Sequence, residues 1–288
     1  KTFYHSRCGH GYNSKVVMPV FKKFAVIGSP IDHSLSPKIH SIFARKLGIE
    51  ITYEAIEVEP MHFDSSVNRL FDEGYAGLNV TLPLKELAFN FADELTEDSN
   101  LSGSVNTLWK EDGIIHGDST DGRGLVRDLQ EKKINLKNKE IVILGAGGAA
   151  KAIIPSLLRE DPKRISIGNR TLVKAEELIE SFSSSKNKMN LFEMSENLNF
   201  KPDIIVNSTS AGIKNEHIEL PRDLLSKDIY VYDLSYSQED TPFLELVKSR
   251  GIENYHDGLG MLIHQAALSF QIWNNQTPNI SISKVELS

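Results

Sequence analysis

Residues 145–150 form a glycine-rich hexapeptide, Gly-Ala-Gly-Gly-Ala-Ala, between a short apolar segment and a segment with helical spacing. A turn that binds the phosphates of a dinucleotide occupies this place, after a strand and before a helix. Gly145 allows the tight turn, Gly147 lets the backbone approach a pyrophosphate, and the small Ala150 permits close packing of helix on strand. The free N–H groups of the helix N-terminus attract the phosphates. The hexapeptide therefore predicts a dinucleotide site, although glycine-rich turns also serve purely structural ends.

The segment after the next expected strand indicates which dinucleotide binds. A cofactor with a free ribose 2′-hydroxyl is held by an acidic residue about 20 residues after the glycine turn. Here the strand ends in Asn169, Arg170 and Thr171, with Lys174 one helical turn later and no carboxylate among them. Arg170 and Lys174 suit a 2′-phosphate. The alternative is a solvated basic turn, but cations at a helix N-terminus oppose its dipole, so an external anion is the better interpretation. We therefore expect NADP rather than NAD.

Three other segments carry polar side chains at the ends of expected strands. Ser34 and Ser36 lie between the first strand and the first helix, Lys85 follows a later strand, and Asp121 comes near the middle of the chain. Each alone is explained as a helix cap, a turn or a solvated charge. Together they could perform chemistry, because an ammonium can stabilise an oxyanion and exchange a proton while a carboxylate orients it. Ketone reduction needs such a proton donor beside a hydride donor.

The elements that must position these residues alternate between strand and helix. In the first series we expect strands at 24–28, 51–58 and 77–80, helices at 37–47 and 61–71, and a hairpin at 107–116 with an Asp-Gly turn. In the second series we expect strands at 140–144, 164–167, 203–206, 229–233 and 253–255, and helices at 149–159, 173–182, 242–250 and 259–273. A linker at 132–139 and a surface loop at 183–188 complete this description. The alternation predicts α/β architecture.

Length and composition limit the function classes. A chain of 288 residues allows about two domains, and 40% apolar with 25% charged residues is ordinary globular usage. The net charge of −7, without a basic block, argues against nucleic-acid binding. No stretch approaches the roughly 18 apolar residues of a membrane span. The single cysteine excludes an intrachain disulfide framework, and no His, Cys and Asp cluster has metal-ligand spacing. We expect a soluble, cytoplasmic protein without a metal.

The motifs taken together resemble the shikimate dehydrogenase family from about Phe24 to the C-terminus. The shared motifs are S-x-S-P, N-V-T-x-P-x-K, G-x-V-N-T, T-D-G, G-A-G-G-A, N-R-T and D-G-L-G-M-L-x-x-Q-A-A, in that order. Ser119 stands where the family normally has Asn before T-D-G. The resemblance implies an N-terminal α/β substrate domain, a Rossmann-type NADP-binding domain and a C-terminal helix that returns to the first domain. It implies domain limits of 23–122 with 258–288, and 123–257, after a mobile extension at 1–22.

The resemblance also implies roles for individual residues. Lys85 and Asp121 would be catalytic. The substrate would be bound by Ser34, Ser36, Thr81, Lys85, Asn106, Asp121, Tyr236 and Gln265. The cofactor would be bound by Gly145, Ala146, Gly147, Gly148, Ala149, Ala150, Asn169, Arg170, Thr171, Lys174, Leu234, Gly258 and Glu97. The most prominent histidines, His33, His40, His116, His256 and His264, are expected to be structural or capping residues.

The implied reaction is the reversible, NADPH-dependent reduction of 3-dehydroshikimate to shikimate, a step toward chorismate and the aromatic amino acids. Two alternatives remain open. One is a dehydrogenase that also accepts quinate. The other is a catalytically silent homologue that binds the ligand or NADP as a regulator, although Lys85 and Asp121 argue against it. The expected partners are small molecules, with no nucleic acid and no membrane, and the chain is a monomer or a homodimer.

Overall fold

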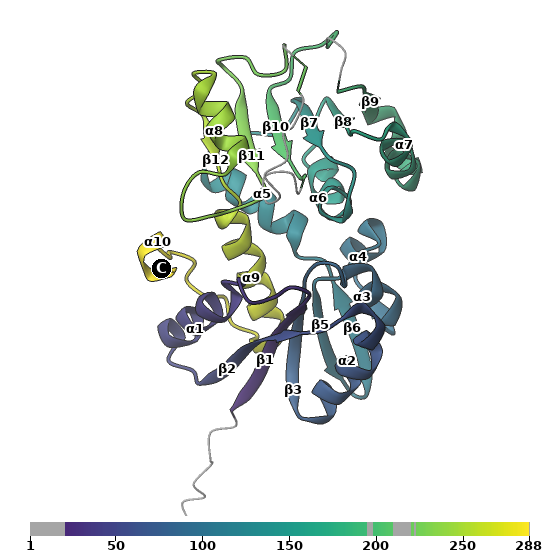
Figure 1. Ribbon diagram of the computed structural model, residues 1–288. Coiled ribbons are helices and arrows are strands. Elements are labelled where there is room, and N and C mark those ends of the chain that lie inside the picture. Colours follow the sequence, from purple (N-terminus) through teal and green to yellow (C-terminus); the bar gives the residue numbers. More distant parts are fainter. Residues whose placement is uncertain (1–20, 195–197, 210–219, 222, 288) are drawn as a thin grey trace, which may run out of the picture.

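The computed structural model describes residues 21–194, 198–209, 220–221 and 223–287. Two six-stranded sheets, each flanked by helices, lie one above the other (Figure 1). The mixed α/β class expected from the sequence is confirmed. Residues 1–20 of the expected N-terminal extension lie outside the described part of the chain.

The N-terminal half of the chain forms a mixed sheet. Its strands are β1 (Lys22–Gly28), β2 (Ile51–Glu57), β3 (Tyr75–Val80), β4 (Glu94–Leu95), β5 (Thr107–Glu111) and β6 (Ile114–Asp118). They lie in the order β2-β1-β3-β5-β6-β4. The first three are parallel, whereas β5 pairs antiparallel with both β3 and β6. Asp112 and Gly113, with φ of 50° and 86°, form the predicted turn of the β5–β6 hairpin.

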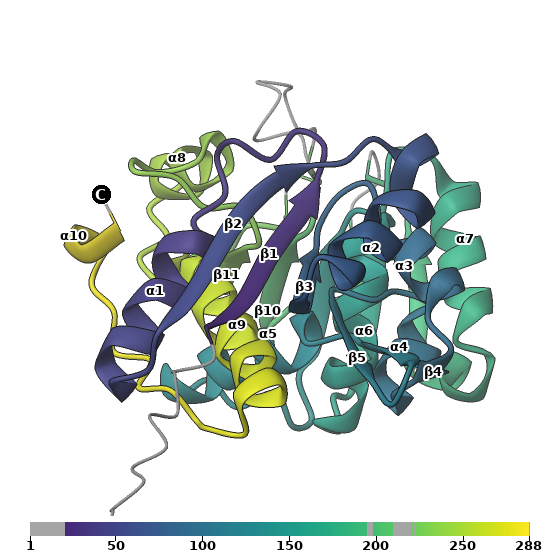
Figure 2. The same ribbon diagram turned by 90° about the horizontal axis from the view of Figure 1, so that it is seen from below.

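Helices cover both faces of this sheet (Figure 2). They are α1 (Ser36–Leu47), η1 (Pro60–His62), α2 (Phe63–Asp72), α3 (Lys85–Phe91) and α4 (Glu97–Ser102). Leu70 of α2 and Ala88 of α3 pack with Leu78 of β3 in one apolar cluster. On the other face α1 packs against the C-terminal helix α9 (Leu259–Asn274) through Ile39 and Phe270. The short helix α10 (Lys284–Leu287) joins this second cluster through Leu287.

The second sheet is entirely parallel. Its strands are β7 (Glu140–Leu144), β8 (Arg164–Gly168), β9 (Met189–Phe192), β10 (Ile204–Asn207), β11 (Tyr230–Asp233) and β12 (Tyr255–His256), in the order β12-β11-β10-β7-β8-β9. Its helices are α5 (Asp121–Glu131), α6 (Gly148–Arg159), α7 (Leu172–Ser181), η2 (Ser183–Lys188) and α8 (Pro242–Ser249). Buried apolar side chains line both faces of β7, as a parallel sheet with helices on both faces requires.

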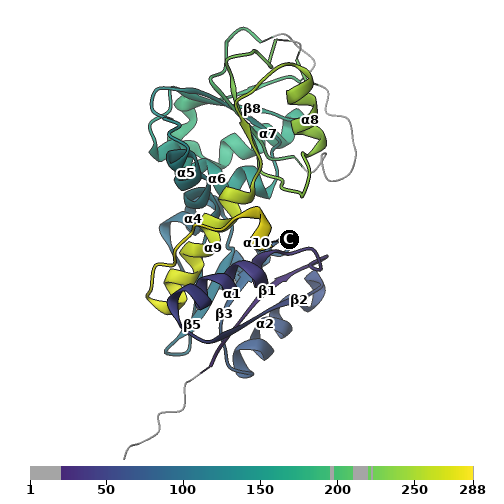
Figure 3. The ribbon, with the colours of Figure 1, turned by 90° about the vertical axis from the view of Figure 1, so that its left-hand side faces the viewer.

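Helix α9 joins the two halves of the molecule (Figure 3). It begins beside the second sheet, crosses α5 and ends against the first sheet. Two glycines permit the close crossing. A Cβ atom on Gly124 would lie 2.8 Å from the backbone nitrogen of Gln265, and one on Gly260 would lie 2.0 Å from Oδ1 of Asp128. Among the described residues, no helix is both long enough and apolar enough to cross a lipid bilayer.

His40 of α1 is fully buried among aromatic side chains. Its ring stacks on Tyr53 with 4.2 Å between ring centres, and Phe43, Phe270 and Trp273 lie within 6 Å. Burial lowers the pKa of His40 to about 3, although the neighbouring Asn79 side chain opposes this effect. His40 is therefore a neutral core residue, as expected from the sequence.

The buried His40 should make the free energy of unfolding depend on pH. In the unfolded chain His40 binds a proton below its ordinary pKa of 6.5, whereas in the folded protein it stays neutral down to about pH 3. Stability is therefore lost as the pH falls from 6.5 toward 3, by about 2 kcal/mol at pH 5. His40→Leu should remove this part of the loss between pH 7 and pH 5, measured by urea unfolding. The exposed His33→Leu is the control, and equal pH dependence in all three proteins would refute the assignment.

Candidate functional site

Lys85 and Asp121 form an ion pair at the junction of the two halves. The ammonium Nζ of Lys85 lies 2.6 Å from Oδ2 of Asp121, and the two side chains are 18% and 7% exposed. Each residue is the first of its helix, Lys85 of α3 and Asp121 of α5. The α5 dipole stabilises the carboxylate, whereas the α3 dipole disfavours the ammonium, which Asp121 compensates. The pair thus places a group that can donate a proton, the Lys85 ammonium, beside the negative charge of Asp121.

Asn106 connects this pair to the helix that returns from the second half. Its Nδ2 lies 2.9 Å from Oδ1 of Asp121, 2.8 Å from the Thr120 hydroxyl and 3.2 Å from Oε1 of Gln265. Its Oδ1 accepts a hydrogen bond from the backbone N–H of Thr120 at 2.9 Å. Asn106 thus orients the carboxylate and brings Gln265 of α9 to it. Four of the predicted site residues, which are far apart in the sequence, therefore meet here: Lys85, Asn106, Asp121 and Gln265.

The two serines expected at the substrate lie at the start of α1. The N-cap residue is Leu35, and no side chain caps this helix, so Ser34 and Ser36 do not act as its caps. The backbone N–H of Ser36 donates to the Ser34 hydroxyl at 3.3 Å, and the Ser36 hydroxyl donates to Tyr53. Tyr53 in turn donates to Oδ1 of Asn79 at 2.7 Å. The loop is therefore held by a buried hydrogen-bonded chain beneath it.

The remaining substrate residues reach the same region from β3 and from the second sheet. Thr81 follows β3, and its methyl group fills the space that a side chain on Gly28 would occupy. Tyr236 follows β11, and the backbone N–H of Leu35 donates to its hydroxyl. Burial raises the pKa of Tyr236. A residue of the second half thus contacts the loop between Ser34 and Ser36.

The glycine turn has the geometry that a pyrophosphate needs. Gly145 has φ of +101°, and its N–H donates to Gly168 at 2.8 Å. A Cβ atom added to Gly147 or Gly148 would meet no atom of the described residues within 4 Å, so among these residues the space in front of the turn is open. Helix α6 starts there without a side-chain cap, and Ala150 is fully buried against the sheet. The turn fits a phosphate group bound by helix N–H groups.

The residues expected at the ribose phosphate lie together at the end of β8. Asn169 Nδ2 donates to the carbonyl oxygen of Thr171 at 2.8 Å, which shapes the turn before α7. The first turn of α7 has no acidic residue, and Lys174 is exposed within it. Arg170 is also exposed. The donor set suits a phosphate ester better than a free 2′-hydroxyl.

The structure brings Leu234 and Gly258 together but places Glu97 differently. A Cβ atom on Gly258 would lie 2.1 Å from the carbonyl oxygen of Leu234, so the two backbones touch. Glu97 starts α4, is 82% exposed and lies 3.9 Å from Arg159 of α6. The neighbouring Asp98 also pairs with Arg159. Glu97 therefore belongs to an ionic contact between α4 and α6.

A cluster that the sequence did not reveal lies where α5 crosses α9. One ligand atom each of Asp128, Glu131 and His264 lies within 4.8 Å of the others, which is close enough for a metal ion. However, Oδ1 of Asp128 already accepts from Lys132 at 2.6 Å and Oδ2 accepts from Tyr232 at 2.7 Å. The Lys132 ammonium supplies the positive charge that a cation would bring. The cluster is an ionic network that fixes the helix crossing.

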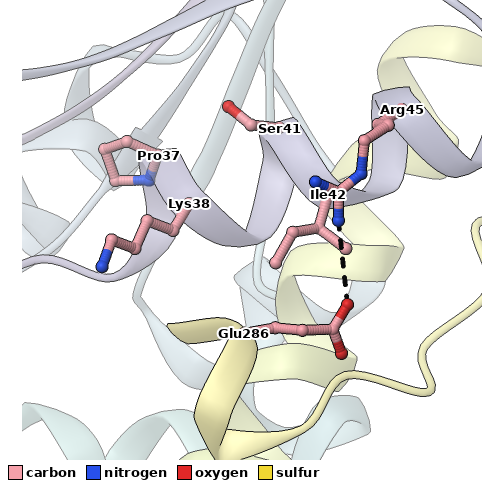
Figure 4. Close-up of a pocket in the computed structure, with 6 residues that line it drawn as sticks. All are labelled: Pro37, Lys38, Ser41, Ile42, Arg45 and Glu286. Atoms are coloured by element: carbon pink, nitrogen blue, oxygen red, sulfur yellow. Dashed lines mark ion pairs between the residues drawn. The ribbon is translucent and has the colours of Figure 1, made fainter. Parts of the chain in front are cut away.

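A cavity of about 360 Å³ lies away from the ion pair, between α1 and α10 (Figure 4). Pro37, Lys38, Ser41, Ile42, Arg45 and Glu286 line it. Arg45 lies 3.7 Å from Glu286, and Nζ of Lys38 donates to the carbonyl oxygen of Leu287 at 3.1 Å. These cations hold the C-terminal turn against α1. The cavity is open to solvent, so it lacks the burial of the Lys85–Asp121 region.

Three family models match successive parts of the chain. The shikimate dehydrogenase substrate binding domain matches residues 26–108, and shikimate / quinate 5-dehydrogenase matches residues 128–236. The shikimate 5′-dehydrogenase C-terminal domain matches residues 258–282. The glycine turn, the strand after it and the returning helix therefore all fall within matched segments.

Curated relatives and solved structures agree with these matches. A shikimate dehydrogenase (NADP(+)) of Legionella pneumophila is 44% identical over 261 residues, which cover 90% of this chain and 96% of the relative. A crystal structure of a shikimate dehydrogenase in complex with NADP⁺ superposes with a TM-score of 0.84 at 35% identity, covering 93% and 94% of the two chains. The Thermus thermophilus enzyme with NADP(H) and shikimate gives 0.81 at 30% identity, covering 91% and 96%. The chain belongs to the shikimate dehydrogenase family.

Proposed function

We propose that this chain reduces 3-dehydroshikimate to shikimate with NADPH, reversibly, and that Lys85 and Asp121 carry the proton-transfer half of the reaction. The observation that supports this most is their 2.6 Å ion pair at the junction of the two halves. An ordinary surface ion pair would be solvated, whereas these side chains are 18% and 7% exposed. A proton donor inside a partly desolvated junction suits carbonyl reduction.

When bound, NADPH would supply the hydride needed at the carbonyl carbon of the substrate. The carbonyl oxygen then gains negative charge, which the Lys85 ammonium stabilises and neutralises by donating its proton. Asp121 keeps Nζ of Lys85 in place and can bind the hydroxyl that forms. Asn106 holds the other carboxylate oxygen at 2.9 Å, so Asp121 cannot rotate away from Lys85. In the reverse direction Lys85 accepts the proton of the hydroxyl.

The substrate would lie between the α1 loop and the returning helix α9. The hydroxyls of Ser34 and Ser36 would bind its carboxylate or a nearby hydroxyl, a part of the substrate that does not react. Thr81, Asn106 and Gln265 would bind the ring hydroxyls, and Tyr236 would cover the substrate from the second half. A carboxylated ring with several hydroxyls matches this set of hydroxyl and amide side chains.

The cofactor would lie along the carboxyl ends of the second sheet. The open glycine turn at 145–150 would bind the pyrophosphate, and residues 169–174 would bind the 2′-phosphate. Leu234 and Gly258 would lie beside the nicotinamide. We place the substrate domain at 23–122 with 258–288 and the NADP domain at 123–257. The two sheets divide the chain at nearly the same point, between β6 and α5.

The assay that tests the reaction follows absorbance at 340 nm with shikimate or quinate and each cofactor in turn. We expect turnover with shikimate and a preference for NADP⁺ over NAD⁺ of at least about tenfold in kcat/KM, because a charge-assisted contact contributes roughly 1.5–3 kcal/mol. Arg170→Ala should lose most of that preference by weakening NADP⁺ alone. The exposed Arg250→Ala should not change it.

Two results would contradict this assignment. NADP binding without turnover on either substrate would support the regulator alternative. An NAD⁺ preference in the unmodified protein, or an unchanged preference in Arg170→Ala, would refute the role of the basic turn.

A second variant tests substrate binding at the α1 loop. Ser34→Ala should raise KM for shikimate about tenfold, the value of one hydrogen bond to a charged group, with little change in kcat. The reason is that Ser34 would hold a part of the substrate that does not react. Steady-state kinetics of Ser41→Ala, on the exposed side of the helix α1 that follows the Ser34 loop, provides the comparison. Unchanged KM in Ser34→Ala would leave this serine a structural role in its loop.

A further inference from the structure

Asp233 is a fully buried carboxyl group that the reaction described above does not use. It is the last residue of β11, at the carboxyl end of the parallel strands, where the glycine turn at 145–150 also lies. Its Oδ1 accepts from Nδ2 of Asn207 at 3.0 Å and from the backbone N–H of Ser235 at 3.1 Å, and its Oδ2 accepts from the Thr241 hydroxyl at 2.5 Å. Burial and the nearby Asp257 raise the pKa of Asp233, and these three hydrogen bonds oppose the effect.

These hydrogen bonds hold together the two ends of the loop that follows β11, residues 234–240. Ser235 lies at the beginning of the segment and Thr241 at its end, and both bind the same carboxyl group. Thr241 is also the N-cap of α8, where its hydroxyl accepts from the N–H of Leu244 at 3.2 Å. Asp233 therefore fixes both ends of the loop 234–240 to the rigid end of the sheet.

This loop carries a side chain that leaves the second half of the molecule. The hydroxyl of Tyr236 accepts from the backbone N–H of Leu35, between the two serines of the α1 loop. The carbonyl oxygen of Ser235 accepts from the N–H of Gly258 at 2.9 Å, which ties the loop to the start of α9 as well. The hydrogen bond of Tyr236 to Leu35 therefore connects loop 234–240 to the loop that carries Ser34 and Ser36.

We infer that Asp233 is a positioning residue for the substrate: by closing the base of loop 234–240 it holds Tyr236 across the junction, so it controls KM for the substrate although it belongs to the cofactor half. The inference rests on the proposed function. The physical reason is that removing the carboxyl leaves three donors without an acceptor, two of them buried, and the loop must move to find water for them. Tyr236 would move with the loop. The glycine turn at 145–150 is held separately, by the hydrogen bond from the N–H of Gly145 to the carbonyl oxygen of Gly168.

The test compares Asp233→Ala with the conservative Asp233→Asn. Asparagine keeps an acceptor for Ser235 and Asn207, and its amide can donate to the Thr241 oxygen. We expect Asp233→Ala to raise KM for shikimate about tenfold or more, with kcat within about threefold. The Kd of NADP⁺ should rise by a clearly smaller factor, because the loop includes Leu234 but not the glycine turn or residues 169–174. Asp233→Asn should restore KM to within about threefold of the unmodified protein. Failure of this rescue would show that the charge matters rather than the position of the loop, and would refute the inference.

Tyr236→Phe and the double variant separate positioning from general stability. If Asp233 acts through Tyr236, Asp233→Ala combined with Tyr236→Phe should raise KM no more than the larger single effect. Multiplied effects would contradict the inference. Asp203→Asn is the matched control, because Asp203 also accepts a backbone N–H, from Glu140, but at the opposite edge of the same sheet. It should lower Tm without changing KM.

Thr241→Val covers the case in which Asp233→Ala does not fold, since it removes one of the three bonds. It should raise KM in the same direction by a smaller factor, and unchanged KM in this folded variant would refute the inference. The unmodified protein is assayed first. Absence of shikimate turnover there would refute the proposed function, whereas normal turnover with unchanged KM in the variants would refute the role of Asp233 alone.

Discussion

The ion pair of Lys85 and Asp121 is the constraint on which the arrangement of the site depends. Two opposite charges are largely withdrawn from water at the starts of two helices, and removing either would leave the other uncompensated, at a cost of about 3–5 kcal/mol. The pair can form because β5 lies between β3 and β6, so the segments after β3 and after β6 leave the same edge of the sheet. The sheet topology thus converts a separation of 36 residues into a contact.

Helix α9 borders the site of this ion pair on another side. Most of its buried residues are apolar, yet Gln265 and Ser269 face the polar centre formed by Asn106 and its neighbours. The approach is possible because Gly124 of α5 leaves room for the backbone of α9. Beneath the α1 loop, Tyr53 and Asn79 continue the same buried network toward Ser36. The two ends of the proposed substrate site are therefore joined by hydrogen bonds through the core, which limits independent movement of either end.

The sequence predicted most strands and the long helices because their hydrophobic periods are clear, and the motifs predicted the family. It did not predict α5, since glycines at positions 122 and 124 hide a helix whose stability comes from packing on α9. The short helices α3 and α4, of seven and six residues, were missed because they are too short to show a helical period. Residues 183–188, expected as a surface loop, form a 3₁₀ helix. Contacts such as those of Asp128 with Tyr232, or Tyr53 with Asn79, join distant segments and have no local signal. The limits of the extension at 1–22 and the oligomeric state stay predictions.

The most direct test of this account is a double-mutant cycle on the ion pair, with kcat, NADP⁺ affinity and Tm measured for Lys85→Ala, Asp121→Asn and the combination. If Lys85 transfers the proton and Asp121 orients it, Lys85→Ala lowers kcat about 10²–10⁴-fold with NADP⁺ affinity nearly unchanged. The double variant then loses less than the product of the single losses, because the two residues act as a unit. Near-normal kcat in a folded but less stable Lys85→Ala protein would show that the pair is only structural and would contradict the account.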